Sequence, residues 1–91
     1  MSDDQTTHDL KCWPAPFADV LEGRKLFEIR RTDDRDFRVG DVLHLREWSE
    51  AEGYTGRSVT TGPLTCVYAG GTWLPDGLAV LGFARLAERR P

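Results

Sequence analysis

Short apolar segments separated by turn-forming residues run through the whole sequence, and only one segment has the apolar spacing of a helix. Within residues 42–48, Leu43, Leu45 and Glu47 fall on one face, and this two-residue period is typical of a half-buried β-strand. Strands are predicted over residues 8–12, 25–31, 42–48 and 78–86, and residues 57–69 are predicted as two short strands or one broken strand. The chain is therefore expected to be mainly β (α+β).

The one predicted helix is short and lies just before Gly23. Phe17, Val20 and Leu21 have the i, i+3, i+4 spacing that places apolar side chains on one face of a helix. Pro16 can begin a helix but cannot continue one, and Gly23 stands where a helix-ending glycine is common. With polar loops predicted over residues 49–56 and 70–77, the elements fit a small β-barrel of five to six strands with one helix covering an opening.

A chain of 91 residues is expected to form a single domain, which we place at residues 8–86. Residues 1–7 and 87–91 are predicted to be flexible ends. No segment approaches the roughly 18 apolar residues of a membrane span, and the start lacks a basic and an apolar signal region. We therefore expect a cytoplasmic domain with no membrane partner, and a monomer is favoured.

Charge is distributed unevenly along the chain. The formal net charge is -3, which argues against a protein that coats nucleic acid by bulk charge. Residues 23–47, however, hold seven basic and six acidic side chains and form the only net-basic part of the sequence. A local site for an anion is therefore compatible with the acidic total.

The densest polar cluster contains Lys25, Glu28 and Arg30. Glu28 and Arg30 are two residues apart, so a strand places them on the same face, and Lys25 at the strand start can turn to either face. Arginine offers a planar fork to a phosphate or a base edge, and glutamate accepts from an amino group. The alternative is that the three charges form a solvated ion network without a ligand.

The pattern Gly23-x-Lys25-x-x-Glu28-x-Arg30 resembles the signature of ASCH domains in the PUA-like superfamily. The later V-G-D at residues 39–41 and Y-T-G-R at residues 54–57 resemble one small bacterial and phage-associated family of that superfamily. The resemblance covers about residues 8–84. It implies a PUA-like β-barrel with its helix beside a cleft, and binding of RNA or a nucleotide in that cleft.

The same resemblance implies roles for the signature residues. Gly23 is expected to allow close approach of the backbone, Lys25 and Arg30 to contact phosphate, and Glu28 to accept from a base edge.

Aromatic and basic residues elsewhere are expected to complete this site. Tyr54 and Arg57 are candidates for the rim, with Tyr54 as a stacking platform. Trp73, in a loop between glycines, is a candidate exposed ring on which a base stacks. Trp13 and Trp48 are predicted either to stack with a ligand or to belong to the core.

Two other functions remain open. Some ASCH relatives are amidohydrolases acting on acetylated cytidine, and nuclease activity has been proposed for others, so Lys25 and Glu28 are the candidate catalytic pair. Glu28 stands where that amidohydrolase has a threonine, and neither Asp76 nor Glu88 clearly matches its distant glutamate. The third possibility is a protein-interaction module.

No cofactor or metal is expected from the sequence. The spacing of His8, Cys12, His44 and Cys66 contains no ligand pair of the usual zinc type. Two cysteines are also too few for a disulfide scaffold, and Cys66 is predicted to behave as a small buried hydrophobe.

Overall fold

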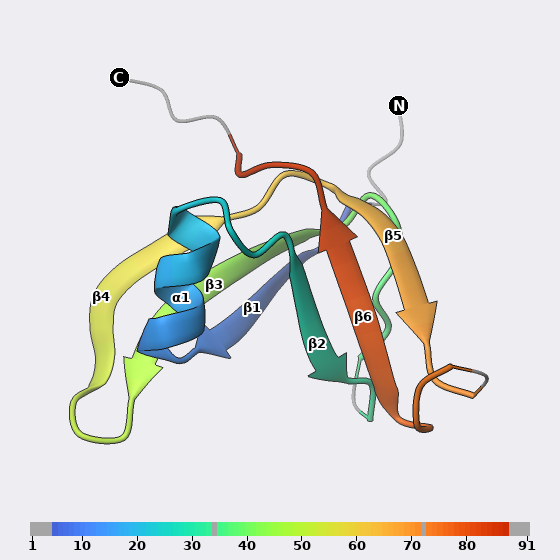
Figure 1. The fold of residues 1–91 in the computed structure, drawn as a ribbon, viewed down its shortest axis with the longest axis horizontal. Helices are drawn as coiled ribbons and strands as arrows, with labels where there is room; N and C mark the ends of the chain where they lie inside the picture. Colours follow the sequence, from blue (N-terminus) through green and yellow to red (C-terminus); the bar gives the residue numbers. More distant parts are fainter. Residues whose placement is uncertain (1–4, 34, 72, 88–91) are drawn as a thin grey trace.

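The computed structural model describes residues 5–33, 35–71 and 73–87. Its elements in chain order are β1 (Thr7–Cys12), α1 (Pro14–Leu21), β2 (Phe27–Arg31), β3 (Val42–Ser49), β4 (Gly53–Thr60), β5 (Leu64–Ala69) and β6 (Leu78–Phe83). The strands pair as two three-stranded sheets, β1-β3-β4 and β2-β6-β5 (Figure 1). The mainly β prediction is confirmed, but the described residues form two separate sheets and no closed barrel.

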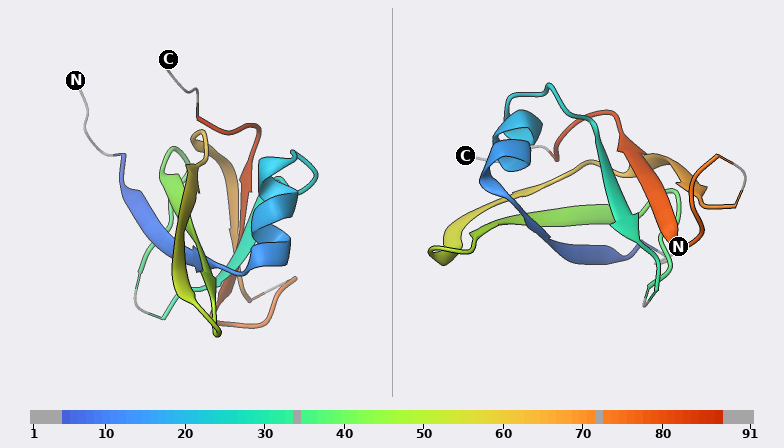
Figure 2. Two further views of the ribbon diagram at one scale, coloured as in Figure 1. Left: turned by 90° about the vertical axis from the view of Figure 1, so that its left-hand side faces the viewer. Right: turned by 60° about the horizontal axis from the view of Figure 1, so that its bottom comes forward.

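The separation of the two sheets follows from the position of β1. This strand pairs in parallel with β3, whereas every other strand pair is antiparallel. Parallel neighbours need a long crossover connection, and here that connection contains α1 and β2. β2 pairs with β6 instead, so the strand carrying the charged cluster becomes one edge of the second sheet (Figure 2).

Helix α1 begins at Pro14, three residues before Phe17, the first residue of the predicted apolar face. Prolines are tolerated there because the first N–H groups of a helix have no partner within it. The helix ends at Leu21, and Gly23 lies just beyond it with a φ of 79°, as predicted for a helix-ending glycine. The N–H groups of Gly23 and Arg24 donate to the carbonyl oxygens of Val20 and Asp19, which closes the last turn and leads directly to Lys25.

Several strand boundaries differ from the prediction, and β6 ends at Phe83, three residues before the predicted end at residue 86. Strand β2 begins at Phe27, two residues later than expected, and β4 begins at Gly53, inside the predicted loop 49–56. The predicted loop is instead part of a hairpin in which Trp48 pairs with Tyr54, and its polar composition gave no indication of a strand. The segment 57–69 contains the end of β4 and the whole of β5, as one of its two readings predicted.

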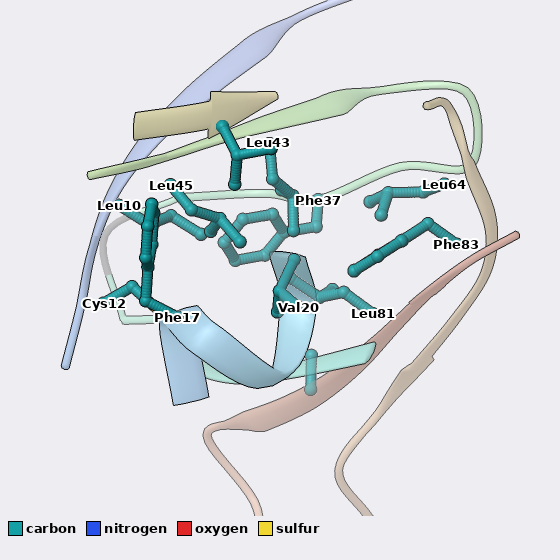
Figure 3. Packing of buried hydrophobic residues seen from close by; sticks show 12 residues of the cluster. Leu10, Cys12, Phe17, Val20, Phe37, Leu43, Leu45, Leu64, Leu81 and Phe83 are labelled. Carbon is teal, nitrogen blue, oxygen red and sulfur yellow. The ribbon is translucent and has the colours of Figure 1, made fainter. Parts of the chain in front are cut away.

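The core lies between the inner faces of the two sheets and α1, as Figure 3 shows. Leu43 and Leu45 of β3 are fully buried, as their alternation predicted, and Phe17 and Val20 of α1 pack with them. Strand β6 is the central strand of its sheet, but Leu78, Val80 and Gly82 on its outer face are partly exposed.

The ends of the chain are described only in part. Of the predicted flexible segments, residues 1–4 and 88–91 lie outside the described residues, and Thr7 belongs to β1. Within the ranges that are described, no helix has the length and apolarity needed to cross a membrane.

Candidate functional site

A buried carboxylate between two cations lies at the centre of the candidate site. Glu28 points inward from β2, and its side chain is only 5% exposed. Its Oε2 atom accepts a hydrogen bond from Nζ of Lys25 at 2.7 Å, and its Oε1 atom accepts from Nη2 of Arg30 at 3.0 Å. The structure therefore brings together the three charged residues of the sequence motif, here called the Lys25–Glu28–Arg30 triad.

The triad carries one more positive than negative charge, and part of its donor capacity is unused. Nζ of Lys25 also donates to the carbonyl oxygen of Phe27, and Nη2 of Arg30 also donates to that of Lys11. An ammonium has three N–H donors and a guanidinium has five. Among the described residues, the third proton of Lys25 and the Nη1 group of Arg30 have no acceptor, so both can bind an added anion.

A pocket of about 520 Å³ opens beside the triad. It lies between the end of β1, the start of α1 and the edge strand β2, and Trp13, Phe27 and Cys12 contribute to its walls. The Arg30–Lys11 hydrogen bond joins the two sheets across this gap. This volume falls in the usual range of small-molecule sites, and the pocket combines aromatic walls with a few charged groups.

Cys12 is one of the pocket residues to which the sequence assigned no role. Burial raises its pKa to about 11, the charge of Glu28 adds to this, and Lys25 and Arg30 act in the opposite direction. Its thiol is therefore neutral at neutral pH and is not a nucleophile there. Its alternation with Leu10 in β1 was the only signal that it points inward.

The predicted rim residues lie away from this pocket. Nη1 of Arg57 is 3.7 Å from Oε1 of Glu47, and its guanidinium lies over the ring of Phe17. Tyr54 lies under the guanidinium of Arg46, which is 3.8 Å from the ring centre. Neither residue lines the pocket of the triad.

Trp73 lies beside β5, the strand of the β2-β6-β5 sheet farthest from β2. It is 80% exposed, as its loop position predicted, and its ring is 6.0 Å from that of Tyr68 on β5. It is not part of the triad's pocket either. Gly23 ends α1, and a Cβ added there would meet no atom within 4 Å.

The four His and Cys residues do not gather in space. In the part of the chain that the structure describes, no three or more His, Cys, Asp or Glu side chains are arranged to hold a metal ion. His8 contacts Asp41 and His44 contacts Asp9, each at 2.8 Å. Cys66 is partly exposed rather than buried, because it lies on the outer face of its sheet beside Gly82.

Comparison with known proteins places this chain in a family. The profile of a family described as "Domain of unknown function (DUF3850)" matches residues 7–83. The chain belongs to the DUF3850 family. The DUF3850 match runs from the first residue of β1 to the last residue of β6, so it contains the triad and its pocket.

A phage protein is similar in sequence to this DUF3850 domain. The "Uncharacterized 12.9 kDa protein in GpA 3'region" of Escherichia phage P2 is 39% identical over 69 residues, which cover 76% of this chain. The expected resemblance to a phage-associated protein is therefore confirmed. The match spans 61% of the phage protein's own length.

Proposed function

We propose that this DUF3850 domain is a PUA-like (ASCH) domain that binds RNA or a nucleotide in the pocket beside the Lys25–Glu28–Arg30 triad. The observation that supports this most is the pocket of about 520 Å³ whose charged wall has an excess positive charge and unused donors. A phosphate carries the opposite charge and accepts several hydrogen bonds at once. An acidic chain can therefore bind one nucleotide without a general attraction for nucleic acid.

The proposal assigns a role to each wall of the pocket. Lys25 and Arg30 contact the phosphate, and the half-exposed rings of Trp13 and Phe27 offer surfaces for a base. Glu28 holds both cations with its two oxygens, so we assign it as a positioning residue for the phosphate contact. Its expected contact with a base edge would use the remaining lone pairs of the same carboxylate.

The test measures binding of nucleoside monophosphates and of a panel of structured RNAs to four proteins. Lys25→Ala and Arg30→Ala are each expected to weaken binding about tenfold or more, since a hydrogen bond to a charged group is worth roughly 1.5–3 kcal/mol. Arg24→Ala is the matched control, because Arg24 is an exposed neighbour that pairs with Asp19 and does not line the pocket. Equal binding by all four proteins would overturn the assignment of the pocket.

The ion-network alternative predicts a different result. If the triad only stabilises the fold, the wild-type protein binds none of these ligands, and Lys25→Ala and Arg30→Ala change only the free energy of unfolding. Circular dichroism and urea denaturation of the same proteins separate a loss of fold from a loss of binding.

The 2.7 Å contact between Lys25 and Glu28 also favours a second candidate function, hydrolysis of a modified nucleoside. A lysine and a carboxylate that share a proton in this way can act as general acid and general base on a substrate that lies within hydrogen-bond distance of either group. Incubation with acylated cytidines, followed by mass spectrometry, tests this. Turnover that disappears in Lys25→Ala would favour the hydrolase, and no turnover across the panel would count against it.

The outer face of the β2-β6-β5 sheet favours a third candidate, a protein-interaction module. Ile29, Tyr68 and Trp73 are each more than half exposed on this side of the molecule. Exposed apolar patches of this kind often bind other proteins. Trp73→Ser should abolish binding to a protein partner if one is found, without changing binding of nucleotides in the pocket.

A further inference from the structure

We infer that a single-stranded nucleic acid continues from the pocket onto the outer face of the β1-β3-β4 sheet, where it binds Lys11, Arg46, Trp48 and Tyr54. This inference rests on the proposed function, because it extends the same ligand beyond the pocket. Of these residues, the sequence assigned Tyr54 to the site and left Trp48 open between stacking with a ligand and the core, whereas it assigned no role to Lys11 and Arg46.

Two unpaired cations face each other on this sheet. Lys11 of β1 is directly opposite Arg46 of β3 in the parallel register, and strands are about 4.8 Å apart. Neither side chain has a carboxylate within 4.0 Å among the described residues, although the chain has 15 acidic and 12 basic residues. Like charges in this position destabilise a sheet, and an anion bound between them removes that cost.

The preceding pair on the same face shows the contrast. Asp9 is opposite His44, and His44 Nδ1 lies 2.8 Å from Asp9 Oδ1. The side chains of Asp9 and His44 are therefore hydrogen-bonding partners of each other. Lys11 and Arg46, both cationic, cannot pair with each other in this way, so they are the part of this face that an anion from outside can neutralise.

Aromatic rings lie directly beside both cations. Nζ of Lys11 is 4.2 Å from the ring centre of Trp48, and the guanidinium of Arg46 is 3.8 Å from that of Tyr54. Trp13 meets Trp48 edge to face at 5.4 Å, and both Trp13 and Tyr54 are about half exposed. Alternating cations and rings are the arrangement that single strands use, with phosphates on the cations and unstacked bases on the rings.

The face is continuous with the pocket. Trp13 and Lys11 both line the pocket of the triad, and the carbonyl oxygen of Lys11 accepts from Arg30. From there the side chains lead across β1 and β3 to Tyr54 on β4. A strand held at the triad by one nucleotide therefore has its next phosphates beside Lys11 and Arg46. A duplex keeps its bases stacked inside and cannot use these rings.

Fluorescence anisotropy with labelled single strands of about eight nucleotides tests this, because sites on small β domains take roughly 4–16 nucleotides. RNA and DNA strands, a duplex of the same sequence and a mononucleotide are compared over a range of salt concentrations. We expect the single strand to bind at least about tenfold tighter than the mononucleotide, since each stacked base adds that order of affinity. Binding of both RNA and DNA, or of RNA alone, supports the inference.

Arg46→Gln is expected to weaken binding of the single strand several-fold and to reduce the slope of log K against log salt by about 0.7. Tyr54→Ala is expected to weaken it about tenfold. Neither change should alter binding of the mononucleotide. Arg38→Gln is the matched control, because it removes an equal charge from a side chain that already pairs with Asp36.

The outcomes distinguish this inference from the proposed function. If the single strand binds no tighter than the mononucleotide, or if the duplex binds equally well, the outer face is not a strand-binding surface and the pocket proposal stands. If Arg46→Gln weakens binding of the strand but Arg30→Ala does not, the outer face is supported and the pocket is overturned. If neither ligand binds, both are overturned.

Discussion

Nε2 of His8 lies 2.8 Å from Oδ2 of Asp41, and both side chains are buried. The Asp41 carboxylate also accepts hydrogen bonds from the backbone N–H groups of Thr6 and Arg38. It thereby ties the start of β1 to the turn before β3. Because β1 and β3 are parallel and far apart in sequence, this contact helps to hold the register that brings Lys11 beside Arg46 and Cys12 beside Glu47.

Asp41→Asn should lower the free energy of unfolding by about 2–3 kcal/mol, because it removes the charge that these buried donors bind. Urea denaturation measures the change. Asp9→Asn is the control: Asp9 also contacts a histidine, but its side chain is 69% exposed, so its loss should cost under about 1 kcal/mol. Equal losses in the two variants would show that the Asp41 contacts do not stabilise the fold.

Asp41 should also make stability depend on pH in the acid range. Burial by itself would raise the pKa of Asp41, but the hydrogen bonds from His8, Thr6 and Arg38 and the charge of His8 hold that pKa below its ordinary value. A lowered pKa in the folded state stabilises the protein above the unfolded pKa of about 4, and this contribution is lost as the pH falls below it. Unfolding free energies measured from pH 7 to pH 2 should show this loss, and Asp41→Asn should lack that part of it.

Cys12 should be unreactive in the folded protein. With its pKa raised to about 11 by burial and by Glu28, only about one thiol in a thousand is ionised at pH 8. Ellman's reagent should therefore titrate one thiol per folded chain, the partly exposed Cys66, and two after denaturation. Cys66→Ser should leave no rapidly reacting thiol, and fast labelling of that variant would contradict the burial of Cys12.

Removal of Glu28 should destabilise the protein more than removal of Lys25. Glu28→Ala leaves the two largely buried cations Lys25 and Arg30 without their shared carboxylate, which costs about 3 kcal/mol. Lys25→Ala leaves Glu28 paired with Arg30, and the Lys25 side chain is itself 19% exposed, so its loss should cost about 1 kcal/mol. Urea denaturation of both variants checks the order, and the reverse order would mean that Glu28 is not the centre of the triad.

Gly23→Ala should lower stability by about 1 kcal/mol, because φ at this position is 79° and side chains other than glycine rarely adopt that conformation. A Cβ there meets no atom within 4 Å, so the cost is backbone strain alone. Gly23→Asn should be milder, since asparagine tolerates this region better. Thermal melting of both variants measures the difference, and a larger loss in Gly23→Asn would contradict this explanation.

Local features of the fold could be predicted from the sequence because they depend on neighbouring residues. The alternation of Leu43 and Leu45 predicted a half-buried strand, and Gly23 marked the end of the helix. The spacing of Glu28 and Arg30 placed both on one strand face. The predicted start of β4 was wrong because the residues around Tyr54 are polar, and a polar composition is as typical of a loop as of an exposed hairpin.

The candidate site was predictable only in its central part. Lys25, Glu28 and Arg30 lie within six residues, so one turn and one strand bring them together wherever that strand pairs. Tyr54, Arg57 and Trp73 come from strands and loops whose partners no local pattern reveals. Their separation from the pocket follows from the pairing of the strands.

The sequence by itself therefore determined a mainly β chain, one short helix and a charged motif on one strand face. Those features depend on backbone preferences and on a period of two or 3.6 residues, which act over a few residues. Only the tertiary structure decided that β1 pairs in parallel with β3, which leaves two sheets instead of a closed barrel. That pairing joins residues about 35 positions apart, and through it Lys11 and Arg46 became neighbours beside the pocket of the triad.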